Sequence, residues 1–140
     1  MQELNIEART DNLGEVLGFI DALLEEHECR AKPQIQINIA VEEIFVNIAN
    51  YAYGEEGGDV DIRAVVTDDP GEITITFTDS GVRYDPVTAE DPDVTLSAEK
   101  REIGGLGIFL TKKSMDELEY EFKDGKNILK MKNKLTLQGR

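Results

Sequence analysis

A chain of 140 residues with 40% hydrophobic side chains can bury the core of one domain and is not a disordered acidic segment. Its net charge of −14, from 15 basic and 29 acidic side chains, argues against nucleic acid or an anionic membrane as a partner and suits a partner with a basic patch. Cys29 is the one cysteine, so no internal disulfide forms. With no signal peptide and no apolar run of membrane-spanning length, we expect a cytoplasmic protein.

The N-terminal region is predicted to form a strand followed by a helix. Apolar residues alternate over residues 3–9, as in a half-buried strand. A helix is expected over about residues 12–28, with Thr10 or Asp11 as its cap. Its apolar stripe comprises Leu13, Val16, Leu17, Ile20, Leu23 and Leu24.

Residues 33–53 contain two competing patterns. Residues 34–39 alternate like a strand, whereas the apolar residues downstream follow helical spacing. Pro33 is compatible with a first helical turn, where its missing N–H group costs nothing. The length of the pattern favours one long helix.

The middle of the chain is predicted to contain two strands and a long loop. Residues 60–67 and 72–79 alternate, and Asp-Asp-Pro-Gly at 68–71 joins them. A turn at residues 54–59 precedes the first of these strands. Residues 84–103 are charged and irregular, and such a loop in a compact domain is usually functional or disordered.

The last part is predicted to be a helix and a hairpin. The helix opens after Gly107 and runs to about Leu118. Strands at 119–123 and 127–132 flank Asp124-Gly125, a strong hairpin signal. The order predicts one α+β domain over residues 1–140: a two-layer sandwich in which a mostly antiparallel mixed sheet carries helices on one face.

The long helix offers a candidate phosphate and metal face. At α-helical spacing, Glu43, Asn47 and Asn50 share a narrow stripe beside the core-facing one. The amide oxygen of Asn47 suits Mg²⁺, and the carboxylate of Glu43 could orient or deprotonate a hydroxyl. Spacing alone is more typical of an ordinary solvated helix face.

The second candidate is Asp79-Ser80-Gly81, which ends a predicted strand. A carboxylate there can accept a hydrogen bond from the exocyclic amine of adenine, and Gly81 would let a flat base approach the backbone. The same three residues are common turn chemistry.

The third candidate is Gly104-Gly105-Leu106-Gly107, which opens the last predicted helix. Glycines leave backbone N–H groups free to bind phosphate oxygens, and the helix N-terminus adds a positive dipole end. No Walker motif is present. A flexible hinge before a core helix is the alternative.

In this order, the three motifs resemble those of the anti-sigma-factor serine/threonine kinases, which belong to the GHKL ATPase superfamily with the Bergerat ATP-binding fold. The resemblance covers nearly the whole chain. It implies a regulator that binds ATP or ADP with Mg²⁺ and phosphorylates a Ser or Thr of a STAS-domain anti-sigma-factor antagonist. Such proteins bind a sigma factor or another target, often as homodimers.

The resemblance also assigns roles by position. It implies that Glu43 is the catalytic base, Asn47 the Mg²⁺ ligand and Asp79 the adenine-binding carboxylate. The implied nucleotide-binding set is Asn47, Asn50, Asp79, Gly81, Tyr84, Gly104, Gly105, Leu106 and Gly107, and residues 84–103 correspond to the ATP lid.

Two positions depart from the family pattern. Arg83 stands where a small or apolar residue is commoner, and residues 125–128 lack the threonine often found near the purine. A second hypothesis is a nucleotide-gated binding module that transfers phosphate poorly or never. A detached histidine-kinase catalytic domain is disfavoured, because the sole histidine, His27, lies inside the predicted fold.

Overall fold

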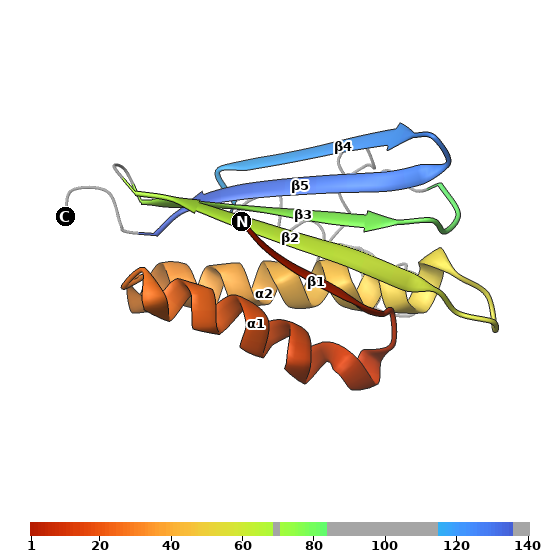
Figure 1. Ribbon diagram of the computed structural model, residues 1–140, viewed down its shortest axis with the longest axis horizontal. Helices are drawn as coiled ribbons and strands as arrows, with labels where there is room; N and C mark the ends of the chain where they lie inside the picture. Colours follow the sequence, from red (N-terminus) through yellow and green to blue (C-terminus); the bar gives the residue numbers. More distant parts are fainter. Residues whose placement is uncertain (69–70, 84–114, 136–140) are drawn as a thin grey trace, which may run out of the picture.

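A five-stranded sheet forms one layer of the molecule in this computed structural model, which describes residues 1–68, 71–83 and 115–135 (Figure 1). Its strand order is β1-β2-β3-β5-β4, and every pairing in the described part of the chain is antiparallel. The bounds are β1 Gln2–Glu7, β2 Asp59–Thr67, β3 Glu72–Asp79, β4 Glu117–Lys123 and β5 Lys126–Lys134.

Two helices cover one face of this sheet (Figure 1), so the predicted α+β sandwich is confirmed. Helix α1 spans Leu13–Glu26 and α2 spans Ala31–Asn47. At its C-terminal end, α2 continues directly into a π-helical turn, η2, at Ile48–Ala52. The long predicted helix is therefore present, but its last turn is wider than an α-helical turn.

Alternation along the strands explains the two layers. Every second residue of β3 is buried, and β2 and β5 alternate in the same way. The outward-facing residues include charged cross-strand pairs, such as Lys130 Nζ with Glu119 Oε1 at 4.0 Å. The largest fully buried side chains, which form the core between sheet and helices, are Phe45, Phe77, Ile20, Leu24, Ile37, Ile62, Ile73, Ile75 and Met131.

The predicted hairpin at Asp124-Gly125 is confirmed. Both residues have positive φ angles, 56° and 77°, and join β4 to β5. A two-residue turn with positive φ at both positions matches the twist of an antiparallel pair.

Two local predictions are wrong. Thr10 and Asp11 do not cap α1; they lie in a 3₁₀ turn, and α1 follows Asn12 without a side-chain cap. The last predicted helix does not reach Leu118, because β4 begins at Glu117 and pairs with β5. The remainder of that helix, from Gly107, lies outside the described residues.

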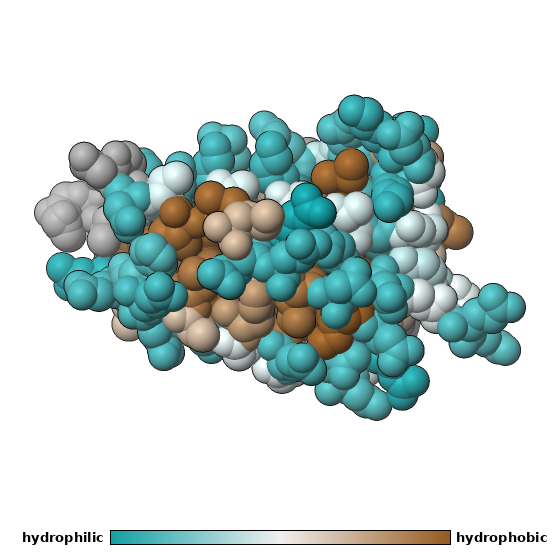
Figure 2. All heavy atoms as spheres, in the orientation of Figure 1, coloured by the Kyte–Doolittle hydropathy of each residue, from teal (hydrophilic) through white to brown (hydrophobic). Residues whose placement is uncertain are grey.

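The surface seen in Figure 2 is mostly hydrophilic and is interrupted by apolar patches, as expected for a chain with a net charge of −14. Within the described ranges, no helix is both long enough and apolar enough to cross a bilayer.

Candidate functional site

Glu43 and Asn47 lie one turn apart near the C-terminal end of α2, and their side chains are in contact. The amide Nδ2 of Asn47 donates a hydrogen bond of 2.9 Å to Glu43 Oε2. Both residues are half-buried, whereas the neighbouring Glu42 is exposed. The structure thus brings the predicted base and the predicted metal ligand together on one helix face.

The carboxyl group of Glu43 has an altered acidity. Partial burial raises its pKa above the usual value of 4.5, the hydrogen bond from Asn47 opposes this rise, and the negative charge of Glu42 adds to it. A carboxylate with a raised pKa is a better proton acceptor near neutral pH. This electrostatic setting is compatible with a general base.

Asn47 retains an oxygen that could bind a metal ion. Its Nδ2 is used by Glu43, and no described group donates a hydrogen bond to its Oδ1. Amide oxygen suits Mg²⁺, which is often held by few protein ligands together with phosphate oxygens and water. No group of three or more acidic, histidine or cysteine ligands occurs among the described residues. The amide oxygen of Asn47 is compatible with a Mg²⁺ ion whose other ligands are phosphate oxygens and water.

Asp79 ends β3 with its side chain on the buried face of the sheet. It is only 6% exposed. Its Oδ1 accepts hydrogen bonds from the backbone N–H of Gly81 at 2.8 Å and from Asn127 Nδ2 at 2.9 Å. Because both hydrogen bonds go to Oδ1, the second oxygen, Oδ2, is available in the described structure for a further donor.

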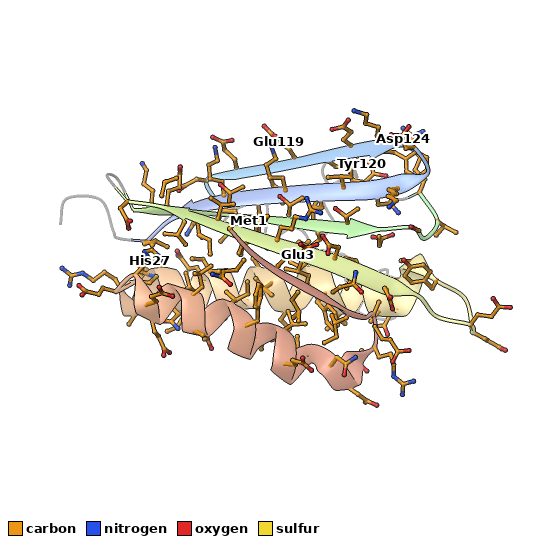
Figure 3. The ribbon with its side chains drawn as sticks, in the orientation of Figure 1. Met1, Glu3, His27, Glu119, Tyr120 and Asp124 are labelled. Atoms are coloured by element: carbon orange, nitrogen blue, oxygen red, sulfur yellow. The ribbon has the colours of Figure 1, made fainter. Side chains whose placement is uncertain are left out.

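Asn127, the residue opposite Asp79 on β5, is the centre of a buried polar network. Its Nδ2 also donates to the carbonyl of Val82 at 2.9 Å, and its Oδ1 accepts the hydroxyl hydrogen of Tyr120. Tyr120 belongs to the edge strand β4, and Figure 3 labels it there together with Glu119. The network therefore joins β3, β4, β5 and the turn that follows β3.

This turn, residues 79–82, also contacts the end of the π-helical turn. The backbone N–H of Val82 donates to the carbonyl oxygen of Ala52 at 2.8 Å. A β-carbon at Gly81 would overlap that same carbonyl group, so only glycine fits without movement. In the structure, the group that lies closest to Gly81 is therefore the carbonyl group of Ala52. The approach of a flat base to Gly81 stays a prediction.

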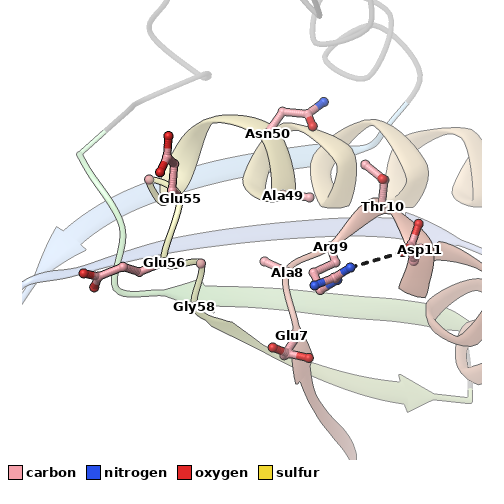
Figure 4. Close-up of a pocket in the computed structure, with 12 residues that line it drawn as sticks. Glu7, Ala8, Arg9, Thr10, Asp11, Ala49, Asn50, Glu55, Glu56 and Gly58 are labelled. Carbon is pink, nitrogen blue, oxygen red and sulfur yellow. Dashed lines mark hydrogen bonds and ion pairs between the residues drawn. The ribbon is translucent and has the colours of Figure 1, made fainter.

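Asn50 lies beyond the end of α2, the helix that carries Glu43 and Asn47. It lies within the π-helical turn, where α-helical spacing does not apply, and its side chain is exposed. With Ala49 it forms one wall of an open cavity of about 320 Å³ (Figure 4). The other cavity residues are Glu7, Ala8, Arg9, Thr10, Asp11, Gly54, Glu55, Glu56, Gly57 and Gly58. The α-helical spacing on which the predicted stripe rests therefore ends before Asn50, and a role of Asn50 in nucleotide binding stays a prediction.

Comparison with known proteins identifies the family. The family model described as "Histidine kinase-like ATPase domain" matches residues 6–133. The chain belongs to this family. The match includes all three predicted motifs, which agrees with the fold and with the buried carboxylate at the end of β3.

Named relatives of this histidine kinase-like ATPase are protein kinases, which confirms the resemblance to the anti-sigma-factor kinases. A "Serine-protein kinase RsbW" of Listeria monocytogenes is 31% identical over 101 residues, or 69% of this chain. The match spans 63% of that relative's length. The "Serine/threonine-protein kinase BtrW" of Bordetella bronchiseptica is 25% identical over 91% of this chain and 87% of its own length.

Solved structures confirm the fold. The crystal structure of the RsbU and RsbW domains of a Mycobacterium tuberculosis protein aligns with all of this chain and 34% of its own, at 16% identity and a TM-score of 0.66. The catalytic domain of the histidine kinase ThkA aligns over 99% of this chain and 100% of its own, at 15% identity and a TM-score of 0.50. At these identities the similarity concerns architecture alone.

Several predicted site residues of this histidine kinase-like ATPase lie outside the described residues. They are Tyr84, Gly104, Gly105, Leu106 and Gly107, together with the predicted lid at residues 84–103. Arg83, at the border of this segment, places its guanidinium carbon 5.1 Å from the centroid of the Phe122 ring on β4. This stacking gives the unusual arginine a defined partner in the structure.

Sequence reasoning missed Asn127, Tyr120 and Tyr53. A signal for Asn127 exists, because it falls on the alternating face of β5 that also carries Leu129 and Met131. A polar residue in a buried register requires polar partners. Tyr53 bridges two segments: its hydroxyl donates to the carbonyl of Asp59 at 2.6 Å and accepts the backbone N–H of Ser80 at 2.8 Å.

Proposed function

We propose that this chain is an ATP-dependent serine/threonine protein kinase that phosphorylates a STAS-domain antagonist and binds a sigma factor, acting in the cytoplasm as a homodimer. The observation that carries the proposal is a pair of polar sites linked by one helix. The Glu43–Asn47 pair lies on α2, and the continuation of α2 contacts the turn that follows Asp79. The kinase names of the relatives support the same activity.

Asp79 is proposed to bind adenine. Its Oδ1 is already occupied by Gly81 and Asn127, which leaves Oδ2 to accept the exocyclic amine of the base. A guanine base presents an oxygen at that position, which a carboxylate repels. ATP and ADP are therefore expected to bind, and GTP to bind poorly.

Glu43 is proposed to accept the proton of the partner's hydroxyl as the oxygen attacks the γ-phosphorus and the bond to ADP breaks. Its raised pKa and its position one turn from Asn47 support this role. Asn47 would contribute its Oδ1 to Mg²⁺. When bound with ATP, Mg²⁺ neutralises phosphate charge. The residues of the chain then have to position the hydroxyl and take up its proton.

The alternative is a nucleotide-gated binding module with little or no phosphotransfer. One observation favours it: Asn47 donates directly to Glu43 Oε2, so in this conformation the base and the metal ligand are bonded to each other. A binding module can keep this bond at all times, whereas a kinase needs the other oxygen of Glu43, or a broken bond, to take up a proton.

The deciding experiment combines the purified protein, labelled ATP, Mg²⁺ and the STAS-domain protein encoded in the same genome. A kinase transfers label to a serine or threonine of the STAS protein, and replacement of Glu43 by glutamine abolishes most of the transfer. Binding of ATP without any transfer to such partners would support the binding module. Absence of ATP binding would reject both.

A further inference from the structure

Tyr53 and Ala52, at the end of the π-helical turn, make three hydrogen bonds that no catalytic assignment uses. Ala52 is buried and Tyr53 is half-buried, although the turn they contact is partly open to solvent. Their partners are backbone groups of residues 59, 80 and 82. These bonds connect the helix that carries Glu43 with the turn that carries Asp79.

We propose that Tyr53 is a positioning residue for nucleotide binding: its hydroxyl holds the turn at residues 79–82 in register with the end of α2. This inference rests on the proposed ATP site. Tyr53 itself touches neither of the proposed reacting groups and acts through the backbone of Ser80.

The hydroxyl of Tyr53 is engaged on both sides. It donates to the Asp59 carbonyl at the start of β2 and accepts from Ser80 N–H directly after Asp79. Two hydrogen bonds restrict the orientation of the Tyr53 hydroxyl group more than a single hydrogen bond would. The Tyr53 ring packs closely against Gly58, where an added β-carbon would overlap it.

The π-helical turn gives these contacts a structural reason. The last carbonyl groups of a helix lack intrahelical partners, and Val82 N–H satisfies that of Ala52. Single π-turns are rare, and they are frequent at functional sites. Here the π-helical turn ends at Ala52, whose carbonyl group lies so close to Gly81 that a β-carbon on residue 81 would not fit. The helix end and the turn after β3 therefore form one fitted unit.

The inference is tested with Tyr53→Phe, which keeps the ring and removes the hydroxyl. Affinity for ADP and for adenosine is measured by calorimetry, and KM and kcat for ATP are measured with a STAS-domain protein. Loss of this net hydrogen bonding should weaken ADP and adenosine binding about threefold to tenfold and raise KM for ATP similarly. The value of kcat should stay within about twofold of wild type, because the groups of the Glu43 face are untouched.

Two controls separate positioning from general loss of stability. Tyr51→Phe makes the same chemical change at an exposed neighbour, and it should leave ADP affinity unchanged. Gly81→Ala should weaken ADP binding more than Tyr53→Phe, since it pushes the turn off Ala52. Gly71→Ala, where the nearest atom to an added β-carbon is 3.6 Å away, should have no such effect.

The outcomes are distinct. Wild-type protein that binds no ADP overturns the proposed function and this inference with it. Wild-type protein that binds ADP while Tyr53→Phe binds it equally well overturns the inference alone, even if the melting temperature of the variant falls. Weaker binding of ADP and adenosine with kcat retained supports it.

Discussion

The turn at residues 79–82 and the α2 face at Glu43 and Asn47 are built in opposite ways. The turn is held from two sides, by Asn127 on β5 and by Ala52 and Tyr53 at the helix end. The α2 face has a single described side-chain hydrogen bond, between two half-buried groups of the same helix. One region is thus held by several segments of the fold, whereas the other is held within a single helix.

This difference suggests a division of labour within the proposed kinase. Preformed hydrogen bonds at the turn lower the cost of ordering a base-binding carboxylate. The proposed base gains and loses a proton during the reaction, and the proposed metal ligand binds Mg²⁺ together with ATP, so a pair held within one helix suits these roles. Substitutions at the turn should therefore change nucleotide affinity, and substitutions on the α2 face should change turnover.

The strongest test of this division is Glu43→Gln. The amide keeps the size of the side chain and can still accept the Asn47 hydrogen bond, but it cannot take up a proton. Phosphotransfer to a STAS-domain partner should fall about 10²–10⁴-fold with ATP affinity nearly unchanged. Glu42→Gln, the same change at the exposed neighbouring residue, is the matched control and should retain activity. A Glu43→Gln variant with the wild-type rate of phosphotransfer would contradict the idea that the α2 face controls turnover.

Asp79→Asn should show the converse pattern. It removes the charged acceptor of Gly81 N–H and Asn127 Nδ2 and places a donor group beside them. ATP affinity measured by calorimetry should fall by roughly 1–3 kcal/mol. Asp124→Asn makes the same change at an exposed turn residue whose positive φ asparagine tolerates, so its affinity should equal that of wild type. Equal affinities for all three proteins would argue against Asp79 as the base-binding group.

Asn127→Ala sharpens the comparison, because the chain offers a second buried asparagine on the same strand. Asn133 is 6% and Asn127 7% exposed, and Asn133 bonds the backbone N–H of Asp116 instead of the turn. Each alanine variant should lose about 1–3 kcal/mol of unfolding free energy through unpaired buried groups. Only Asn127→Ala should also weaken ATP binding, by about threefold to tenfold, at temperatures where both variants are folded. Equal ATP affinities of the two variants would show that Asn127 does not support nucleotide binding.

The smallest expected effect concerns the pH dependence of stability. Burial raises the pKa of Glu43 above 4.5, its usual value in an unfolded chain. Its contribution to stability is therefore fully present below pH 4.5 and is lost as the pH rises through the raised value. Glu43→Gln should melt slightly above wild type at pH 7, and this advantage should disappear by pH 4. A larger advantage at pH 4 than at pH 7 would contradict the direction of the shift.

The sequence predicts the elements that depend on local patterns. Strict alternation predicts β3 to the residue, and Asp124-Gly125 predicts the β4–β5 hairpin. The spacing of Glu43 and Asn47 predicts their contact, because residues four apart are neighbours on an α-helix.

Features that depend on distant segments were not predictable in this way. The π-helical turn is matched to Gly81 and Val82, about thirty positions further along the chain. The partner of Asp79 lies 48 residues away on β5. For the same reason α-helical spacing did not predict the π-helical turn that holds Asn50, because local residues alone do not set the width of that turn.

The strand order has a consequence for the biosynthesis of the protein. The last strand of the described chain, β5, inserts between β3 and β4 instead of joining an edge. At a translation rate of about 5–20 residues per second, Asn127 is synthesised roughly 2–10 seconds after Asp79. Throughout that interval the emerging chain carries an open β3 edge, a surface on which strands of other chains can pair. If Asp79 binds the nucleotide as proposed, stabilisation by bound ATP would begin only after β5 has supplied Asn127, the hydrogen-bond partner of the Asp79 carboxylate.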